Sequence, residues 1–330
     1  MRVVHHARGL IRAFLAGFLA VSGVVAADQA QPSPTVHPLS PEAISERLQA
    51  GYPGIVAGVE GLDLIFADKT KLPLDDGRPN KSAGDLVDKP DIEDMFRQPY
   101  EPGPLGQPPP EDWDPGRARN EAFFLKVYGD CRKHEVEPHL VDVVWLPKKY
   151  GHKLKATKIN GVADRLRAIS VELDALPKKF DVDLYPSAGT YNCRVVAGTK
   201  ALSAHGFGIA IDIALKHSSY WRWFLAKSNG KADPKSGGKG AVKAGSKSAA
   251  KSDIQPGTLP GPQSASVARY RNAIPMEIVR IFERHGFIWG GKWRHFDTMH
   301  FEYRPELLPV AAPDNANLGP AKAAVPALAK

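Results

Sequence analysis

Two short stretches of the chain combine histidine with aspartate at spacings that suit a metal site. The first is SAHGFGIAIDI, in which His205 precedes two glycines and Asp212 lies within an alternating apolar run. Side chains alternate between the two faces of a strand, so Asp212 shares its face with the small Ala210, and the isoleucines take the other face. A buried carboxylate is costly unless a partner neutralises it. The pattern therefore favours a cation beside Asp212, with His205 as a second ligand.

The second stretch, HFDTMHFE, offers the third ligand in His300, three residues after Asp297. A catalytic zinc site takes three protein ligands and leaves one position open. With one Zn2+ ion per chain held by these two histidines and Asp212, Asp297 is placed to take the proton of the attacking water and pass it to a leaving amine. Each stretch alone has little specificity, and the alternative is a set of core and surface residues without a chemical role.

Regular elements surround both stretches. Apolar residues at helical spacing predict helices at 41–54, 120–130, 159–176 and 274–286. Apolar, β-rich or alternating runs predict strands at 61–77, 140–147, 189–196, 207–215, 286–293 and 299–305. Helices mixed with short antiparallel strands predict an α+β fold, with a small antiparallel sheet flanked by helices and the zinc in a cleft on that sheet.

The positive charge is concentrated in two places. The formal net charge is +8, but lysines recur every fourth residue from Lys227 to Lys251, and three arginines lie at the N-terminus. The rest of the chain is close to neutral and has no basic-aromatic motif, so the sequence does not favour binding to nucleic acid. Glycines and Pro234 disfavour a helix in the lysine-rich part. We predict a flexible, solvated insertion at 227–265.

The first residues have the pattern of an export signal. Three arginines precede Ala13–Ala26, an uncharged apolar run that is shorter than the roughly 20 residues of a membrane-spanning helix. Small residues before Asp28 fit a cleavage site near Ala27. We predict a signal peptide at 1–27, export, and no membrane span after its removal. An uncleaved anchor is the alternative.

The chain contains two cysteines, Cys131 and Cys193. An even pair in an exported protein favours a disulfide, and the alternative is two free buried thiols. The cysteines are far apart and have no C-x-x-C partner, which disfavours a role in metal binding.

Three motifs carry a resemblance to a known family. SAHGFGIAID resembles the S-x-H-x-x-G-x-A-x-D signature of the zinc D-alanyl-D-alanine carboxypeptidases, which include the VanX and VanY types and the L-alanyl-D-glutamate endopeptidases. GFIWGGKWRHFDTMHFEYRP resembles the W-G-G-x-W and D-x-x-H-F signature of the endopeptidase-like branch. YNCRVVAGTKALSAHG carries the preceding arginine, and DPGRARNEAFF is also similar to one branch. The resemblance covers Glu121 to Glu306 and implies a fold of the hedgehog type.

The resemblance implies roles for individual residues. It makes His205, Asp212 and His300 the zinc ligands and Asp297 the catalytic carboxylate. Arg194 matches an arginine that binds substrate or polarises the scissile carbonyl, as a guanidinium near a metal can.

Four further residues have open roles. Ser203 is expected to hydrogen-bond substrate or to support the His205 loop, and Trp289 to line the cleft. His295 either orients Asp297 and stabilises the transition state or is a packing residue. Glu302 is either a partner behind the site or a charge on the strand surface.

These observations predict a signal peptide at 1–27, a Pro-rich N-terminal extension with short ordered elements at 28–117, a zinc peptidase domain at 118–310 that contains the insertion, and a disordered tail at 311–330. The expected function is hydrolysis of peptidoglycan stem peptides, as an L,D-endopeptidase or a D,D-carboxypeptidase, in the periplasm or at the cell wall. A non-catalytic, zinc-containing wall-binding module on the same fold is the alternative. The insertion either covers the site, binds anionic wall polymers or has no role. The Pro-rich region either lies across the cleft as a lid or pro-segment or has no role.

Overall fold

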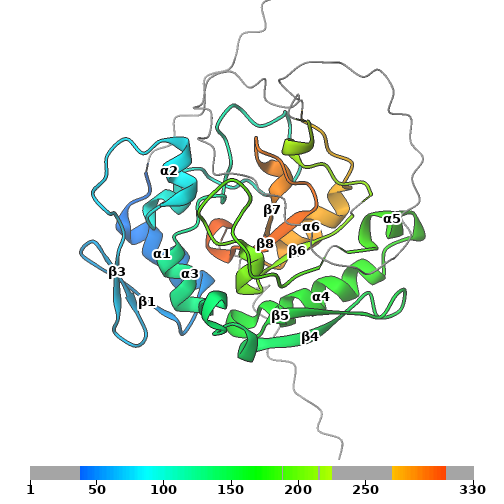
Figure 1. Ribbon diagram of the computed structural model, residues 1–330, viewed down its shortest axis with the longest axis horizontal. Helices are drawn as coiled ribbons and strands as arrows, with labels where there is room; N and C mark the ends of the chain where they lie inside the picture. Colours follow the sequence, from blue (N-terminus) through cyan, green and yellow to red (C-terminus); the bar gives the residue numbers. More distant parts are fainter. Residues whose placement is uncertain (1–37, 188, 215, 225–269, 310–330) are drawn as a thin grey trace, which may run out of the picture. The chain divides into compact units, whose positions relative to one another are not determined.

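The antiparallel sheet β6–β8–β7 carries both stretches that contain the predicted ligands. The computed structural model describes residues 38–187, 189–214, 216–224 and 270–309 (Figure 1), and all of them belong to one of the two units into which the chain divides. β6 spans Ala210–Asp212, β8 spans His300–Tyr303 and β7 spans Phe287–Trp289, and β8 lies between the other two strands. The last residue of β6 and the first residue of β8 therefore meet at one end of the sheet.

Helix α6, Met276–Arg284, covers the apolar face of this sheet. Its buried Phe282 stacks on Phe301 of β8, with 3.9 Å between the ring centroids. Because side chains alternate along a strand, His300 and Glu302 take the opposite face of β8 from Phe301. The sheet thus has one face in the hydrophobic core and one face that carries polar and charged side chains.

A second layer consists of the hairpin β4–β5 and helix α4. β4 spans Leu140–Trp145, β5 spans His152–Thr157 and α4 spans Val162–Asp174. Helix α4 packs on both strands and on α6 (Figure 1). The short helix α5, Asp181–Leu184, follows. Helix α3, Glu121–Tyr128, begins at the Asn120 cap. Phe124 of α3 packs on Phe207, 5.6 Å between ring centroids, and so supports the turn that contains His205.

The N-terminal part is folded against the rest of the protein. It comprises α1, Pro41–Gly51, the antiparallel strands β1, Val56–Glu60, β2, Asp63–Phe66, and β3, Lys71–Pro73, and helix α2, Ala83–Asp88. Tyr52 donates a hydrogen bond to Glu306 at 2.9 Å, and Tyr100 donates one to Glu283 at 2.8 Å. Both bonds are buried, so this part shares its packing with the C-terminal elements.

The mixture of helices and small antiparallel sheets confirms the α+β prediction, but one strand prediction is wrong. Residues 189–196 form only isolated bridges, Gly189 with Asp212 and Val195 with Leu202. The chain turns back after the second bridge, where Val196 N bonds Ala201 O at 2.9 Å, so no strand can extend there.

Several predictions lie outside the described residues, namely the signal peptide at 1–27, the insertion and the tail. The domain boundary at residue 118 stays a prediction. Within the described ranges, every helix is too short or too polar to cross a membrane.

Candidate metal centre

His205 is held by the turn on which it lies. The turn, Ala204–Phe207, begins at Ser203, whose buried hydroxyl accepts a hydrogen bond from His205 N at 3.4 Å. The imidazole Nδ1 contacts the carbonyl oxygen of Thr190. Since a carbonyl can only accept, Nδ1 is the protonated nitrogen and Nε2 carries the lone pair. Ser203 therefore supports the His205 turn, and Nε2 of His205 is the nitrogen available to a metal ion.

Strand register brings the other two predicted ligands together. Asp212 of β6 pairs with His300 of β8, and directly opposed residues of an antiparallel pair share a face. Asp212 Oδ1 lies 3.0 Å from His300 Nδ1 and 3.2 Å from His205 Nε2. The three ligand atoms lie within 4.8 Å of one another, a spacing that one metal ion can span. The structure thus places all three predicted ligands in one cluster.

The second nitrogen of His300 is engaged by Glu302, which lies two residues along β8 on the same face. The distance between His300 Nε2 and Glu302 Oε2 is 2.9 Å, and Glu302 is fully buried. A carboxylate behind the imidazole fixes the ring orientation and is the usual arrangement at metal-binding histidines. Glu302 is therefore a partner behind the site rather than a surface charge.

The cluster fits a divalent cation. Within the described part of the chain, the buried Nε2 of His205 has no hydrogen-bond partner, although it faces Asp212. Burial acts to lower the pKa of His300, but hydrogen bonds to Asp212 and Glu302 reverse the effect and raise it to about 10. Burial acts to raise the pKa of Asp212, but His205 and His300 hold it well below its usual range. These carboxylates require positive charge, and two nitrogens with one carboxylate oxygen are a zinc donor set.

Asp297 lies on the wall of a cavity of about 250 Å3 that also contains the three-residue cluster. Its buried Oδ1 has no hydrogen-bond partner among the described residues. Burial raises the pKa of Asp297 to about 6, with His300 acting against the rise and Asp212 adding to it. A carboxylate with a pKa near neutrality can accept a proton in one step and return it in the next.

Residues 197–303 match the family model described as D-alanyl-D-alanine carboxypeptidase. This part of the chain is similar to that peptidase family. The matched region contains the three clustered residues and Asp297, and it confirms the family predicted from the motifs. No curated protein and no solved structure matches the chain.

The cavity is lined differently from the sequence prediction in one respect. Trp289 is fully buried and donates its indole N–H to Thr298 O at 3.0 Å, so it belongs to the core. Trp293 lines the cavity instead. The exposed Arg194 is also on the wall, as are Ser203 and His295.

A disulfide joins Cys131 to Cys193 and confirms the predicted pairing. Arg194 follows Cys193 directly, and its carbonyl accepts a hydrogen bond from Ser203 N at 2.9 Å. The disulfide therefore ties the loop of Arg194 to the turn Cys131–Lys133, which follows α3. This arrangement fixes the backbone of Arg194, which carries the exposed guanidinium, at the edge of the cavity.

Several functional contacts come from residues to which the sequence assigned no role. Thr190 bonds His205, Asp114 bonds His295, and Arg119 bonds Glu302. Arg119 and Arg117 also line the cavity. The motif DPGRARNEAFF, which contains three of these residues, was the available signal, but only the fold connects each of them to its partner.

Proposed function

We propose that this protein is a zinc metallopeptidase that hydrolyses peptide bonds in the stem peptides of peptidoglycan. The observation that carries the proposal is the position of Asp297 on the same cavity wall as the cluster of His205, Asp212 and His300. The family match supports a peptidase, and the donor set supports zinc. The buried, unpaired oxygen of Asp297 supports its role as the base.

The side chains divide the reaction among them. His205 Nε2, an Asp212 oxygen and His300 Nδ1 would hold a zinc ion, which would supply Lewis acidity when bound. Asp297 takes a proton from the attacking water and delivers it to the leaving amine. Arg194 offers a charged donor to the carbonyl oxygen or to a substrate carboxylate. Its exposure at the cavity edge suits contact with an arriving substrate.

The proposed location is outside the cytoplasm, in the periplasm or at the cell wall. The Cys131–Cys193 disulfide supports this location, because structural disulfides persist in oxidising compartments. The N-terminal apolar run supports it as an export signal. Stem peptides of the wall would be within reach of an enzyme placed there.

The test is digestion of purified muropeptides with and without a chelator, followed by mass spectrometry. The expected result is cleavage that the chelator abolishes and zinc restores. A product shortened by one terminal D-alanine identifies a D,D-carboxypeptidase, and a cut between L-alanine and D-glutamate identifies an L,D-endopeptidase. Asp297→Asn is the matched variant, which should bind zinc and fail to cleave. Zinc binding and wall affinity without cleavage by the unaltered protein would replace the proposal by the non-catalytic wall-binding module.

A further inference from the structure

A short segment that precedes the family match is built into the wall of the cavity. This segment, Asp114–Arg119, is called the strap here. Two side chains of the C-terminal part make three hydrogen bonds to strap carbonyls: the Trp293 indole donates to Pro115 at 2.7 Å, and Arg304 donates to Gly116 at 2.5 Å and to Ala118 at 3.2 Å. Trp293 itself lines the cavity, and Arg304 is fully buried. The strap is therefore fastened to the site rather than laid over it.

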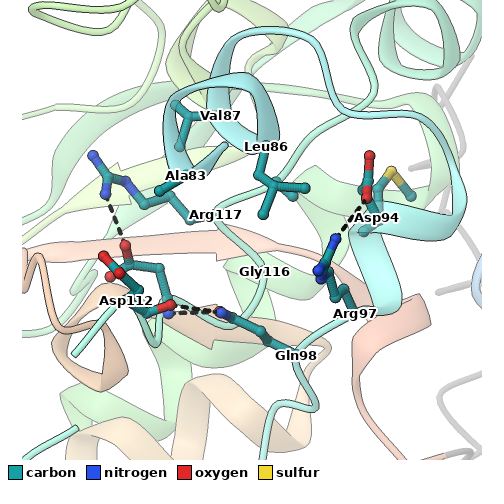
Figure 2. A pocket seen from close by; sticks show the side chains of 12 residues that line it. Ala83, Leu86, Val87, Asp94, Arg97, Gln98, Asp112, Gly116 and Arg117 are labelled. Atoms are coloured by element: carbon teal, nitrogen blue, oxygen red, sulfur yellow. Dashed lines mark hydrogen bonds and ion pairs between the residues drawn. The ribbon is translucent and has the colours of Figure 1, made fainter. Parts of the chain in front are cut away.

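The strap is also braced from its other side. Gln98 donates to Asp112 O at 2.7 Å and accepts from Asp114 N at 2.6 Å. Figure 2 shows this loop with Gly116 and Arg117 beside Ala83 and Val87 of α2. Gly116 has a φ of +83°, and a Cβ there would lie 2.4 Å from Ile288 Cδ1 of β7. Only glycine permits this close approach to the sheet.

One end of the strap acts on a predicted metal ligand. Arg119 is buried, and its Nε and Nη2 lie 3.1 and 3.0 Å from Glu302 Oε2. The same oxygen lies 2.9 Å from His300 Nε2. Arg304 engages the other oxygen of Glu302 at 3.1 Å. A buried carboxylate held by two guanidiniums has one orientation, and this orientation directs His300 Nδ1 towards Asp212.

The other end of the strap acts on a second histidine of the cavity. Asp114 accepts from His295 N at 2.9 Å through Oδ1, and its Oδ2 lies 2.6 Å from His295 Nδ1. Arg117 pairs with the same carboxylate at 2.9 Å. The ring of His295 also packs edge-on against Trp221, with 4.6 Å between the ring centroids. These contacts fix the imidazole on the wall of the cavity that Asp297 also lines.

We propose that the strap is an integral part of the active site, in which Arg119 positions His300 through Glu302 and Asp114 positions His295. This inference rests on the proposed zinc peptidase function. It makes the Pro-rich region a permanent wall of the site instead of a removable lid. Arg119 and Asp114 are positioning residues, because each acts through another side chain.

The two positioning roles predict different results for two variants of the full chain. Arg119→Met keeps an apolar side chain of similar length and leaves Glu302 without one cation. We expect its zinc affinity, measured by competition with a chromophoric chelator, to fall by about 10-fold to 100-fold. Arg117→Met makes the same change two residues earlier, does not touch Glu302, and should keep the affinity of the unaltered protein.

Asp114→Asn should leave zinc affinity unchanged and lower kcat/KM by about 10-fold or more. Its second readout is the NMR signal of the His295 imidazole nitrogens in the metal-free protein, which should move when the carboxylate that contacts Nδ1 is lost. Asp112→Asn is the control in the same loop, with an exposed side chain. A purely structural role for Asp114 would leave this signal of His295 in place.

The outcomes separate this inference from the proposed function. If the unaltered protein binds no zinc, the proposed function fails and the strap loses its role with it. If it binds zinc but Arg119→Met binds equally well and Asp114→Asn leaves the His295 NMR signal in place, only the inference is overturned. If Arg119→Met does not fold, Arg119→Lys takes its place. We expect the zinc affinity of Arg119→Lys to be lower than that of Arg117→Met but still measurable. The inference would also be overturned if Arg119→Lys and Glu302→Gln both bound zinc with the affinity of the unaltered protein.

Discussion

Asp212 and His300 are directly opposed on β6 and β8, and Asp212 Oδ1 lies 3.0 Å from His300 Nδ1. Ala210 and Glu302 form the next pair on the same face, so the small alanine leaves room for the carboxylate that holds His300. A register slip of one residue would replace His300 by Phe301 on this face. Sheet pairing therefore specifies two of the three predicted ligands and the carboxylate behind one of them.

Replacing Asp212 by Asn should weaken zinc binding more than any change behind the ligands. The amide keeps the shape of the side chain but removes the negative charge that faces both histidines. We expect the zinc dissociation constant to rise by more than about 100-fold, the upper end of what the loss of an outer partner costs. Competition with a chelator measures it. Unchanged zinc content in the purified variant would show that the cluster is not the metal site.

Asp297→Asn should separate catalysis from metal binding. Asp297 is on the cavity wall and is not one of the three clustered residues, so zinc content should equal that of the unaltered protein. Removing a general base lowers the turnover number by about 100-fold to 10,000-fold. Steady-state cleavage of a stem peptide, together with metal analysis, measures both quantities. Retention of full turnover would assign the base to another group.

Local sequence patterns predicted the parts of the site that depend on local geometry. The alternation around Asp212 placed it on the face with Ala210, and the structure has that arrangement. Helical spacing predicted α4 and α6, whose apolar positions are buried. The proximity of His205 and His300 was predicted from the need of a zinc site for a third protein ligand and from the resemblance of both stretches to one family's motifs.

Contacts between segments that are distant in the sequence could not be predicted from such local patterns. Arg119 and Glu302 are 183 residues apart, and a Pro-rich segment gives no periodicity from which a partner can be inferred. Trp289 was assigned to the cleft because nothing in the sequence shows which residues of β7 face the core. Its partner on β8 is Phe301, whose side chain faces the core, and Trp289 shares that face. Trp293, four residues later, lines the cavity instead.

The disulfide should contribute substantially to stability. It closes a loop with a sequence separation of 62 residues, which corresponds to about 4 kcal/mol of unfolding free energy in the chain-entropy view. We expect the double variant Cys131→Ser, Cys193→Ser to melt about 10 °C lower, measured by calorimetry. A reductant should lower the melting temperature of the unaltered protein to the same extent and leave the variant as it is. A reductant effect in the variant would point to some other cause.

Gly208→Ala should damage the His205 turn. Gly208 has a φ of +70°, and an added Cβ would lie 2.8 Å from Leu140 Cδ2 and 3.1 Å from Thr157 N. The left-handed backbone costs about 1 kcal/mol for alanine, and the clash with a backbone atom adds to that, so we expect a loss of about 2 kcal/mol or more. Gly54→Ala is the control, because its φ is +72° and no atom lies within 4 Å of the added Cβ. Equal losses in both variants, measured by denaturant unfolding, would exclude the clash.

Asp114 should make the stability of the protein depend on pH in the acid range. Burial acts to raise the pKa of Asp114, but Arg117 and His295 lower it to about 2 from a usual value of 3.8. Since the folded state favours the carboxylate, the contribution is present above pH 3.8 and is lost as the pH falls towards 2. The shift corresponds to about 2 kcal/mol. Denaturant unfolding of the unaltered protein and Asp114→Asn at pH 6, 4 and 2.5 should therefore give a difference that shrinks on acidification. A difference that stays constant over this range would mean that the carboxylate has no altered pKa and that its contacts with His295 and Arg117 contribute through shape alone.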